Sequence, residues 1–153
     1  MKKFLHCIFD PASENTLEKA LCFMRVGIGI LTMIHGIPKI MGGVDMWGGL
    51  GVTFMFPLGI DFMPVTWGFL AACTEFFGGI SYILGLGTRI SSAALSFMMF
   101  IATLWHLNRG DGYNLYSFPL SLLVVFIAFM FIGSGVCSMD NHIAMNIEEK
   151  PKF

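Results

Sequence analysis

The chain has 153 residues, of which 56% are hydrophobic and only 12% are charged, and its mean hydropathy is +0.74. Because soluble domains carry about 25% charged residues, this composition excludes an ordinary water-soluble domain and indicates a single integral membrane domain. The formal net charge of −1 gives no field that would attract nucleic acid. We therefore expect the lipid bilayer, and not nucleic acid, as the first partner.

Residues 1–17 hold a short apolar run that breaks at Asp10 and Pro11 and lacks the small-residue cleavage site of a secretory signal. We expect a cytoplasmic lead-in here. Four long apolar stretches follow, at residues 18–40, 64–86, 89–108 and 115–134. Each is close to the roughly 20 residues that a helix needs to cross about 30 Å of hydrocarbon. The fold class is therefore predicted as all-α, a membrane four-helix bundle over residues 18–142 with a cytoplasmic tail over 143–153.

The connections between these helices differ in character. Residues 41–63 are glycine-punctuated but apolar, which is typical of a segment lying in the membrane interface. Gly85 and Gly87 are well placed to end one helix before a tight turn at residues 87–88. Residues 109–114 form a short polar loop. We therefore expect an interfacial segment between the first two helices and short connections after it.

The distribution of lysine and arginine predicts the orientation. With four spans, both termini and the 87–88 turn share one side of the membrane. That side carries Lys2, Lys3, Lys19, Arg89, Lys150 and Lys152. The opposite side carries only Lys39 and Arg109. By the positive-inside rule, the N- and C-termini are expected in the cytoplasm.

Polar and small residues are predicted to share one face of each of the first two helices. In the first helix, a sector about 120° wide contains Arg25, Gly29, Thr32, His35, Gly36 and Lys39. In the second helix, the face that carries Glu75 also carries Ala71, Gly78, Gly79 and Tyr82. Small residues around a buried acid let another helix approach closely, so that helix is expected to bring the partner of the acid.

The rise per residue predicts a polar column through the bundle. Arg25 is placed nearer the inner side, Glu75 near mid-membrane, and His35, Lys39 and His106 toward the outer side. An unpaired charge at mid-membrane costs roughly 2.5–3.5 kcal/mol, which pairing of Glu75 with Arg25 or Lys39 would offset. Two interpretations stay open: the pair only fixes helix register, or these residues line a cavity that binds a polar head group or relays protons.

The usual metal-ligating residues do not form a recognisable site. The four cysteines lack C-x-x-C spacing, so neither a disulfide framework nor a zinc site is expected. His35 and His106 could ligate haem from opposite helices, but two histidines without a further motif are weak evidence. The twelve methionines are more typical of core and lipid-facing positions than of copper ligands. We predict no metal site.

Several segments over about residues 20–142 resemble the DoxX family of small four-helix membrane proteins. They are RVGIGILTMIHGIPKI in the first span, AACTEFFGGISYILGLGTRISSAAL across the turn, and MMFIATLWH closing the third span. The family usually ends with Gly-Pro-Gly, a basic residue, then serine, a hydrophobic residue and aspartate. Here the end reads GSGVCSMD, in which Ser134 replaces the proline, the basic residue is absent, and Ser138 and Asp140 remain.

The resemblance implies a link to quinone chemistry, because named relatives are associated with thiosulfate-to-quinone electron transfer and with terminal quinol oxidases. It also implies a bacterial inner (plasma) membrane location. The sequence holds no motif that would carry electrons alone. We therefore expect a membrane subunit of a quinone-linked oxidoreductase system that is not catalytic alone and that works with a redox partner protein or as a homo-oligomer.

A quinone site needs only an apolar slot with one or two polar groups. On this hypothesis the catalytic residues are Glu75, which exchanges the proton, and His35, and the quinone is held by Arg25, Lys39, Tyr82 and His106. The alternatives are a non-catalytic assembly or scaffold protein and a small proton or solute carrier.

Overall fold

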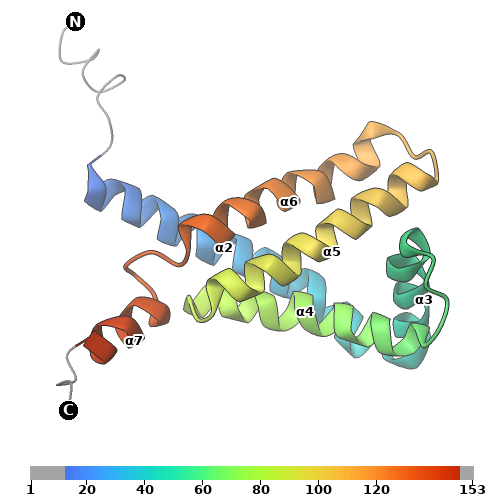
Figure 1. Cartoon of the computed structure of the whole chain (residues 1–153), viewed down its shortest axis with the longest axis horizontal. Coiled ribbons are helices and arrows are strands. Elements are labelled where there is room, and N and C mark those ends of the chain that lie inside the picture. The colour runs from blue at the N-terminus through green and yellow to red at the C-terminus, as the bar shows by residue number, and fades with distance from the viewer. Residues whose placement is uncertain (1–12, 149–153) are drawn as a thin grey trace, which may run out of the picture.

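The computed structural model describes residues 13–148, and every regular element in this part of the chain is a helix. The elements are α2 (Glu14–Met41), α3 (Gly43–Met55), the 3-10 helix η1 (Phe56–Leu58), α4 (Pro64–Leu84), α5 (Thr88–Asn108), α6 (Tyr113–Ile132) and α7 (Met139–Glu148). Figure 1 shows their arrangement. Most of the lead-in expected over residues 1–17 lies outside the described residues, as does the end of the expected tail.

Four of these helices, α2, α4, α5 and α6, are long and apolar enough to cross a membrane. They coincide with the four predicted spans, so the predicted all-α four-helix fold is confirmed. The first helix begins earlier than its apolar run, because the hydroxyl of Ser13 accepts a hydrogen bond from the backbone N–H of Thr16 and caps the helix start. The segment expected at the interface is itself mostly helical, as α3 and η1.

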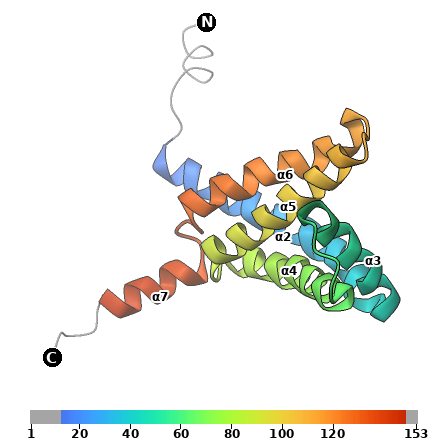
Figure 2. The same cartoon turned by 45° about the vertical axis from the view of Figure 1, so that its right-hand side comes forward.

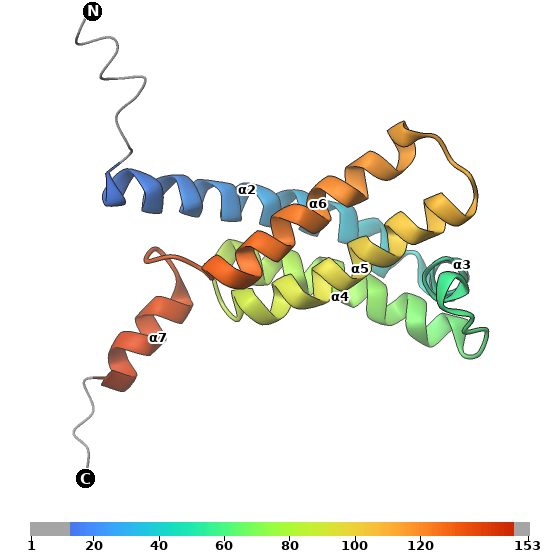
Figure 3. The same cartoon turned by 45° about the horizontal axis from the view of Figure 1, so that its top comes forward.

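The bundle consists of two close helix pairs, with α2 along α4 and α5 along α6 (Figure 1, Figure 3). Glycines allow the first pair to approach backbone to backbone. A Cβ added at Gly36 would lie 2.6 Å from the backbone nitrogen of Phe76, and one at Gly79 would lie 2.5 Å from that of Met33. Both distances are far below van der Waals contact, so only glycine fits. The expectation that glycines around Glu75 make room for another helix is confirmed.

Helix α3 lies across one end of the bundle rather than along it (Figure 1, Figure 3). It crosses α4 closely, because a Cβ on Gly68 would lie 2.8 Å from the backbone nitrogen of Gly51. The indole N–H of Trp47 donates to the carbonyl of Lys39 at 2.9 Å, which ties α3 to the end of α2. This orientation suits an interfacial helix, although its position in a membrane stays a prediction.

The opposite end of the bundle is closed by two glycines and an aspartate. Gly85 and Gly87 both have left-handed backbone conformations, with φ of 66° and 62°, and they turn the chain from α4 into α5. The carboxylate of Asp140 accepts hydrogen bonds from the N–H groups of Gly87 at 2.7 Å and Thr88 at 3.1 Å. From there α7 projects away from the bundle (Figure 2). It continues across residues 142 and 143, the expected boundary between the bundle and the tail.

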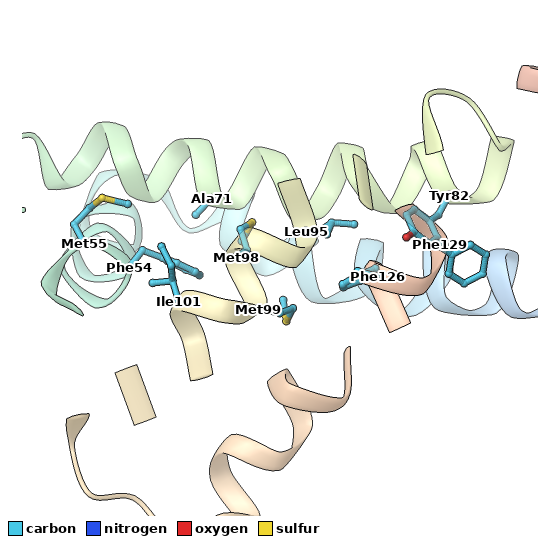
Figure 4. Close-up of a cluster of buried hydrophobic side chains, with 10 residues drawn as sticks. All are labelled: Phe54, Met55, Ala71, Tyr82, Leu95, Met98, Met99, Ile101, Phe126 and Phe129. Carbon is cyan, nitrogen blue, oxygen red and sulfur yellow. The ribbon is translucent and has the colours of Figure 1, made fainter. Parts of the chain in front are cut away.

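Buried apolar side chains run along the length of the bundle (Figure 4). Tyr82, Phe126 and Phe129 pack edge to face at one end, with ring centroids 5.5 and 5.3 Å from the tyrosine ring. Phe54 of α3 and Ile101 of α5 form the other end, and Leu95, Met98 and Met99 lie between (Figure 4). The core therefore holds α3 and the two helix pairs as one unit.

Candidate functional site

A cavity of about 250 Å³ lies among α2, α4, α5 and α6, and Phe54 of α3 also lines it. Its apolar lining consists of Ile28, Leu31, Phe54, Met99, Ala102, Leu115, Phe118, Pro119, Leu122 and Phe126. Its polar lining consists of Thr32, His35, Lys39, Glu75 and His106. Small-molecule sites typically enclose about 300–1,000 Å³ and combine apolar walls with a few polar groups. The cavity is therefore large enough for a ring-sized head group but not for a whole lipid.

Glu75 is the buried charge of this cavity. It is only 3% exposed, and both of its carboxylate oxygens lie 2.5 Å from the Nζ of Lys39. Lys39 follows Gly36 on α2 by about one helical turn, so the glycine contact with α4 places its ammonium group at the acid. The approaching helix does bring the partner of Glu75, as the sequence predicts. The lysine side chain stays 26% exposed, so this ion pair is buried on the acid side only.

Arg25 lies elsewhere, and the pairing of Glu75 with this arginine is not formed. The Arg25 guanidinium is 1% exposed and donates to the carbonyls of Tyr82 at 2.5 Å and Cys137 at 2.6 Å. The first carbonyl belongs to the last turn of α4, and the second belongs to the turn before α7. These bonds engage the two terminal nitrogens of the guanidinium and tie three parts of the chain together, whereas its buried Nε has no hydrogen-bond partner among the described residues. Arg25 does not line the cavity.

Tyr82 also lies outside the cavity, although it was expected to bind the cofactor. Its hydroxyl pairs with the hydroxyl of Ser92 at 2.6 Å, and Ser92 donates to the carbonyl of Thr88 at 2.6 Å. Its ring packs against Phe126, which lines the inner end of the cavity. The tyrosine thus supports the cavity wall from behind.

The two histidines lie on opposite walls of the cavity. His35 of α2 is exposed, and its ring centroid lies 5.9 Å from that of Phe118 on α6. His106 of α5 is partly buried, and its Nδ1 lies 2.8 Å from the Oδ2 of Asp111. The sequence places Asp111 in a polar loop but does not indicate that it contacts His106. The signal that could have revealed it is the glycine just before it, which ends α5 and turns the chain back.

The cavity opens sideways between α2 and α6. These two helices have little contact with each other, since α2 packs along α4 and α6 along α5. Three cavity residues on this seam are exposed: Leu31 is 62% exposed, Leu115 is 55% exposed and Phe118 is 57% exposed. The seam therefore lies between two helices that are long and apolar enough to cross a membrane.

The sequence of the chain matches known proteins over most of its length. Residues 20–108 match the DoxX family model. The chain belongs to the DoxX family. It is also 34% identical over 140 residues to an uncharacterized protein of Haemophilus influenzae, which covers 83% of this chain and 96% of that protein. No solved structure matches the chain.

Membership of the DoxX family and four apolar helices together establish an integral membrane protein. The matched region ends with α5, so it includes Lys39, Glu75 and His106 but neither Asp111 nor the α6 wall of the cavity. The Haemophilus influenzae relative carries no assigned activity.

Proposed function

We propose that this DoxX protein is a membrane subunit of a quinone-linked redox system and that its cavity binds the quinone head group. The observation that carries this proposal is the pairing of the buried Glu75 with the partly exposed Lys39 in a mostly apolar cavity that opens sideways between two candidate membrane spans. A structural ion pair needs no such opening. A ligand that is dissolved in the bilayer and carries polar atoms on an apolar ring needs all of these features.

The polar lining suits the two oxygen atoms of a quinone. Lys39 and His35 can donate hydrogen bonds to quinone carbonyls, and the carboxylate of Glu75 can accept one from a quinol hydroxyl. The apolar residues form a slot for the ring, and the seam between α2 and α6 gives the isoprenoid tail a way out to the lipid. Because polar groups are few and the walls are apolar, the cavity favours a quinone over a hydrated ion or a sugar.

On this proposal Glu75 exchanges a proton with one oxygen of the head group, and Lys39 stabilises the carboxylate once the proton has left. His35 lies at the mouth of the cavity and donates a hydrogen bond to the entering head group. Arg25 and Tyr82 take no part in binding, because their polar groups are engaged at the far end of the bundle.

A bundle of this kind would supply the quinone site and leave electron transfer to a redox partner protein. We place the protein in the bacterial inner membrane because it belongs to the DoxX family. The distribution of lysine and arginine favours both termini in the cytoplasm. The start of α2 and helix α7 would then be available to a partner or to a second copy of the chain on the cytoplasmic side.

The test is binding of decylubiquinone, a short-tailed benzoquinone, to the full chain in lipid nanodiscs. Saturable quenching of tryptophan fluorescence, measured against empty nanodiscs, gives the affinity. We expect Glu75→Gln to weaken binding by about tenfold, the effect of losing one hydrogen bond to a charged group. Glu14→Gln, which changes an exposed acid in the first turn of α2, is the matched control and should bind as the wild type does.

Unchanged binding in Glu75→Gln would contradict the role of this acid. A wild-type chain that folds but shows no saturable binding would instead favour the assembly or scaffold function. Proton or solute flux in liposomes that Glu75→Gln abolishes would favour the carrier function.

A further inference from the structure

The C-terminal end of α5 folds back on itself and holds a carboxylate against an imidazole. Gly110 has a left-handed backbone conformation with φ of 70°, and its N–H bonds the carbonyl of Leu107 at 3.0 Å. The N–H of Asp111 bonds the carbonyl of His106, also at 3.0 Å. This pair of bonds is the Schellman motif, in which a glycine ends a helix and returns the next residue over the last turn. The backbone thus positions Asp111 beside His106.

The side chains of Asp111 and His106 also contact each other. The Oδ2 of Asp111 lies 2.8 Å from the Nδ1 of His106, so the carboxylate holds the proton of the ring on that nitrogen. Nε2 is then the imidazole nitrogen that remains for a ligand in the cavity, which His106 lines. The Nε of Arg109 lies 3.7 Å from the same Oδ2, and its guanidinium covers the ring of Trp105 at 5.5 Å. Asp111 therefore has a cationic neighbour on the side away from the cavity.

His106 faces charged groups from two directions. Asp111 and Arg109 lie on the loop side, and Lys39, Glu75 and His35 line the same cavity from α2 and α4. The His106–Asp111 pair joins a residue that lines the cavity to the polar loop after α5. An imidazole that is hydrogen-bonded to a carboxylate on one nitrogen can take up a proton on the other, because the carboxylate stabilises the imidazolium.

We propose that His106, positioned by Asp111, is the second proton-exchanging group of the cavity and connects the head group to the aqueous side of the 109–112 loop. This inference rests on the proposed quinone site. Glu75 exchanges a proton with one oxygen of the head group, and His106 exchanges a proton with the other. The O–H bond of a quinol breaks with its electron pair left on oxygen, and an N–H bond forms at Nε2. The imidazolium, paired with Asp111, then loses a proton to water on the loop side.

The test measures the affinity for a quinol and the protonation of the His106 ring. The full chain, labelled with nitrogen-15 histidine in nanodiscs, is titrated under argon with decylubiquinol, and His106→Gln identifies the signal of His106. We expect the Nδ1–H form in the free protein and a change at Nε2 as decylubiquinol saturates the site. We expect Asp111→Asn to bind about tenfold more weakly and to lose the single tautomer, and Asp111→Glu to recover both.

The matched control is Asp61→Asn, which changes an exposed carboxylate in the loop before α4 and should leave affinity and tautomer unchanged. An unchanged Nε2 signal at saturation would overturn the role of His106, even if the variants fold poorly, because it is measured on the wild type. Equal affinities of Asp111→Asn and Asp61→Asn would overturn the role of Asp111. In both cases weak binding by Glu75→Gln would leave the proposed quinone site standing, whereas no saturable binding by the wild type would overturn both proposals.

Discussion

The contact between Gly36 and α4 offers a sharp test of how packing sets the site. In Gly36→Ala, the new Cβ would lie 2.6 Å from the nitrogen and 2.8 Å from the Cα of Phe76, whereas ordinary contact begins at 3.4 Å. Both atoms belong to the backbone of α4, so they cannot rotate away as the end of a side chain could. The two helices must therefore separate at this point by a large part of an ångström.

The separation lowers stability in two ways: it disturbs the packing of α2 on α4, and it weakens the Lys39–Glu75 ion pair. Forcing an extra methyl group into a well-packed contact costs about 1–3 kcal/mol, and alanine returns about 1 kcal/mol through its better helix propensity. Lys39 lies one helical turn beyond Gly36, so the same movement lengthens its 2.5 Å contacts with the Glu75 carboxylate. With the weakened ion pair included, we expect a net loss of about 1–2 kcal/mol in unfolding free energy.

The assay is unfolding of the full chain by sodium dodecyl sulfate in mixed micelles, followed by helical circular dichroism. Gly27→Ala is the matched control, since it lies on the same helix and its added Cβ would meet nothing within 4 Å. We expect Gly27→Ala to unfold at or above the wild-type midpoint and Gly36→Ala clearly below it, with weaker decylubiquinone binding. The reasoning would be refuted if the two variants unfolded at the same midpoint.

Three further predictions follow from the other contacts. Glu75→Gln should lower the unfolding free energy by about 1–3 kcal/mol, because it leaves Lys39 without its partner. The double variant Glu75→Gln/Lys39→Met should recover most of that loss in the same assay. An equally unstable double variant would contradict the stabilising role of the ion pair. Arg25→Met should lower stability by about 3 kcal/mol, since two charged hydrogen bonds are lost, and yet leave decylubiquinone affinity within twofold; a large loss of affinity would place Arg25 in the site after all. Asp140→Asn should cost about 1 kcal/mol and speed amide hydrogen exchange in the first turn of α5; unchanged exchange there would show that the carboxylate is not its cap.

Helical periodicity predicted most of the buried face of each of the first two helices, although His35, assigned to the same stripe, is exposed. Gly29, Gly36, Gly79 and Glu75 all lie on faces that the sequence assigned to the protein interior. This succeeded because a membrane helix has few polar residues, so those present mark the side that must avoid lipid. The four spans were recognisable for the same reason.

The choice between Arg25 and Lys39 could not be made from the sequence. Both lie on the buried stripe of α2, but they are about 21 Å apart along a helix with 1.5 Å rise per residue, so Glu75 can pair with only one. The register is decided by which glycines meet the α4 backbone, and several alignments of glycines look alike in sequence. The folding back of the turn at Cys137, which supplies an acceptor to Arg25, depends on contacts between distant segments.

The sequence also could not predict where the cavity opens. A polar column was expected, and Lys39, Glu75 and His106 do line one space, but its opening depends on the weak packing of α2 against α6. Helix–helix distances of this kind are set by side-chain packing along the whole bundle, which no local pattern reports. The position of Asp111 is more predictable, because the glycine before it is a local signal for a helix end at which the chain folds back over the last turn.

The most direct test of the account is an experimental structure of the full chain in lipid nanodiscs with added decylubiquinone. The account predicts density for a ring in the cavity between α2 and α6, with one oxygen within hydrogen-bond distance of Glu75 or Lys39 and the tail leaving along Leu31 and Phe118. A cavity closed by direct packing of α2 on α6, with quinone density only on the outer surface of the bundle, would contradict it.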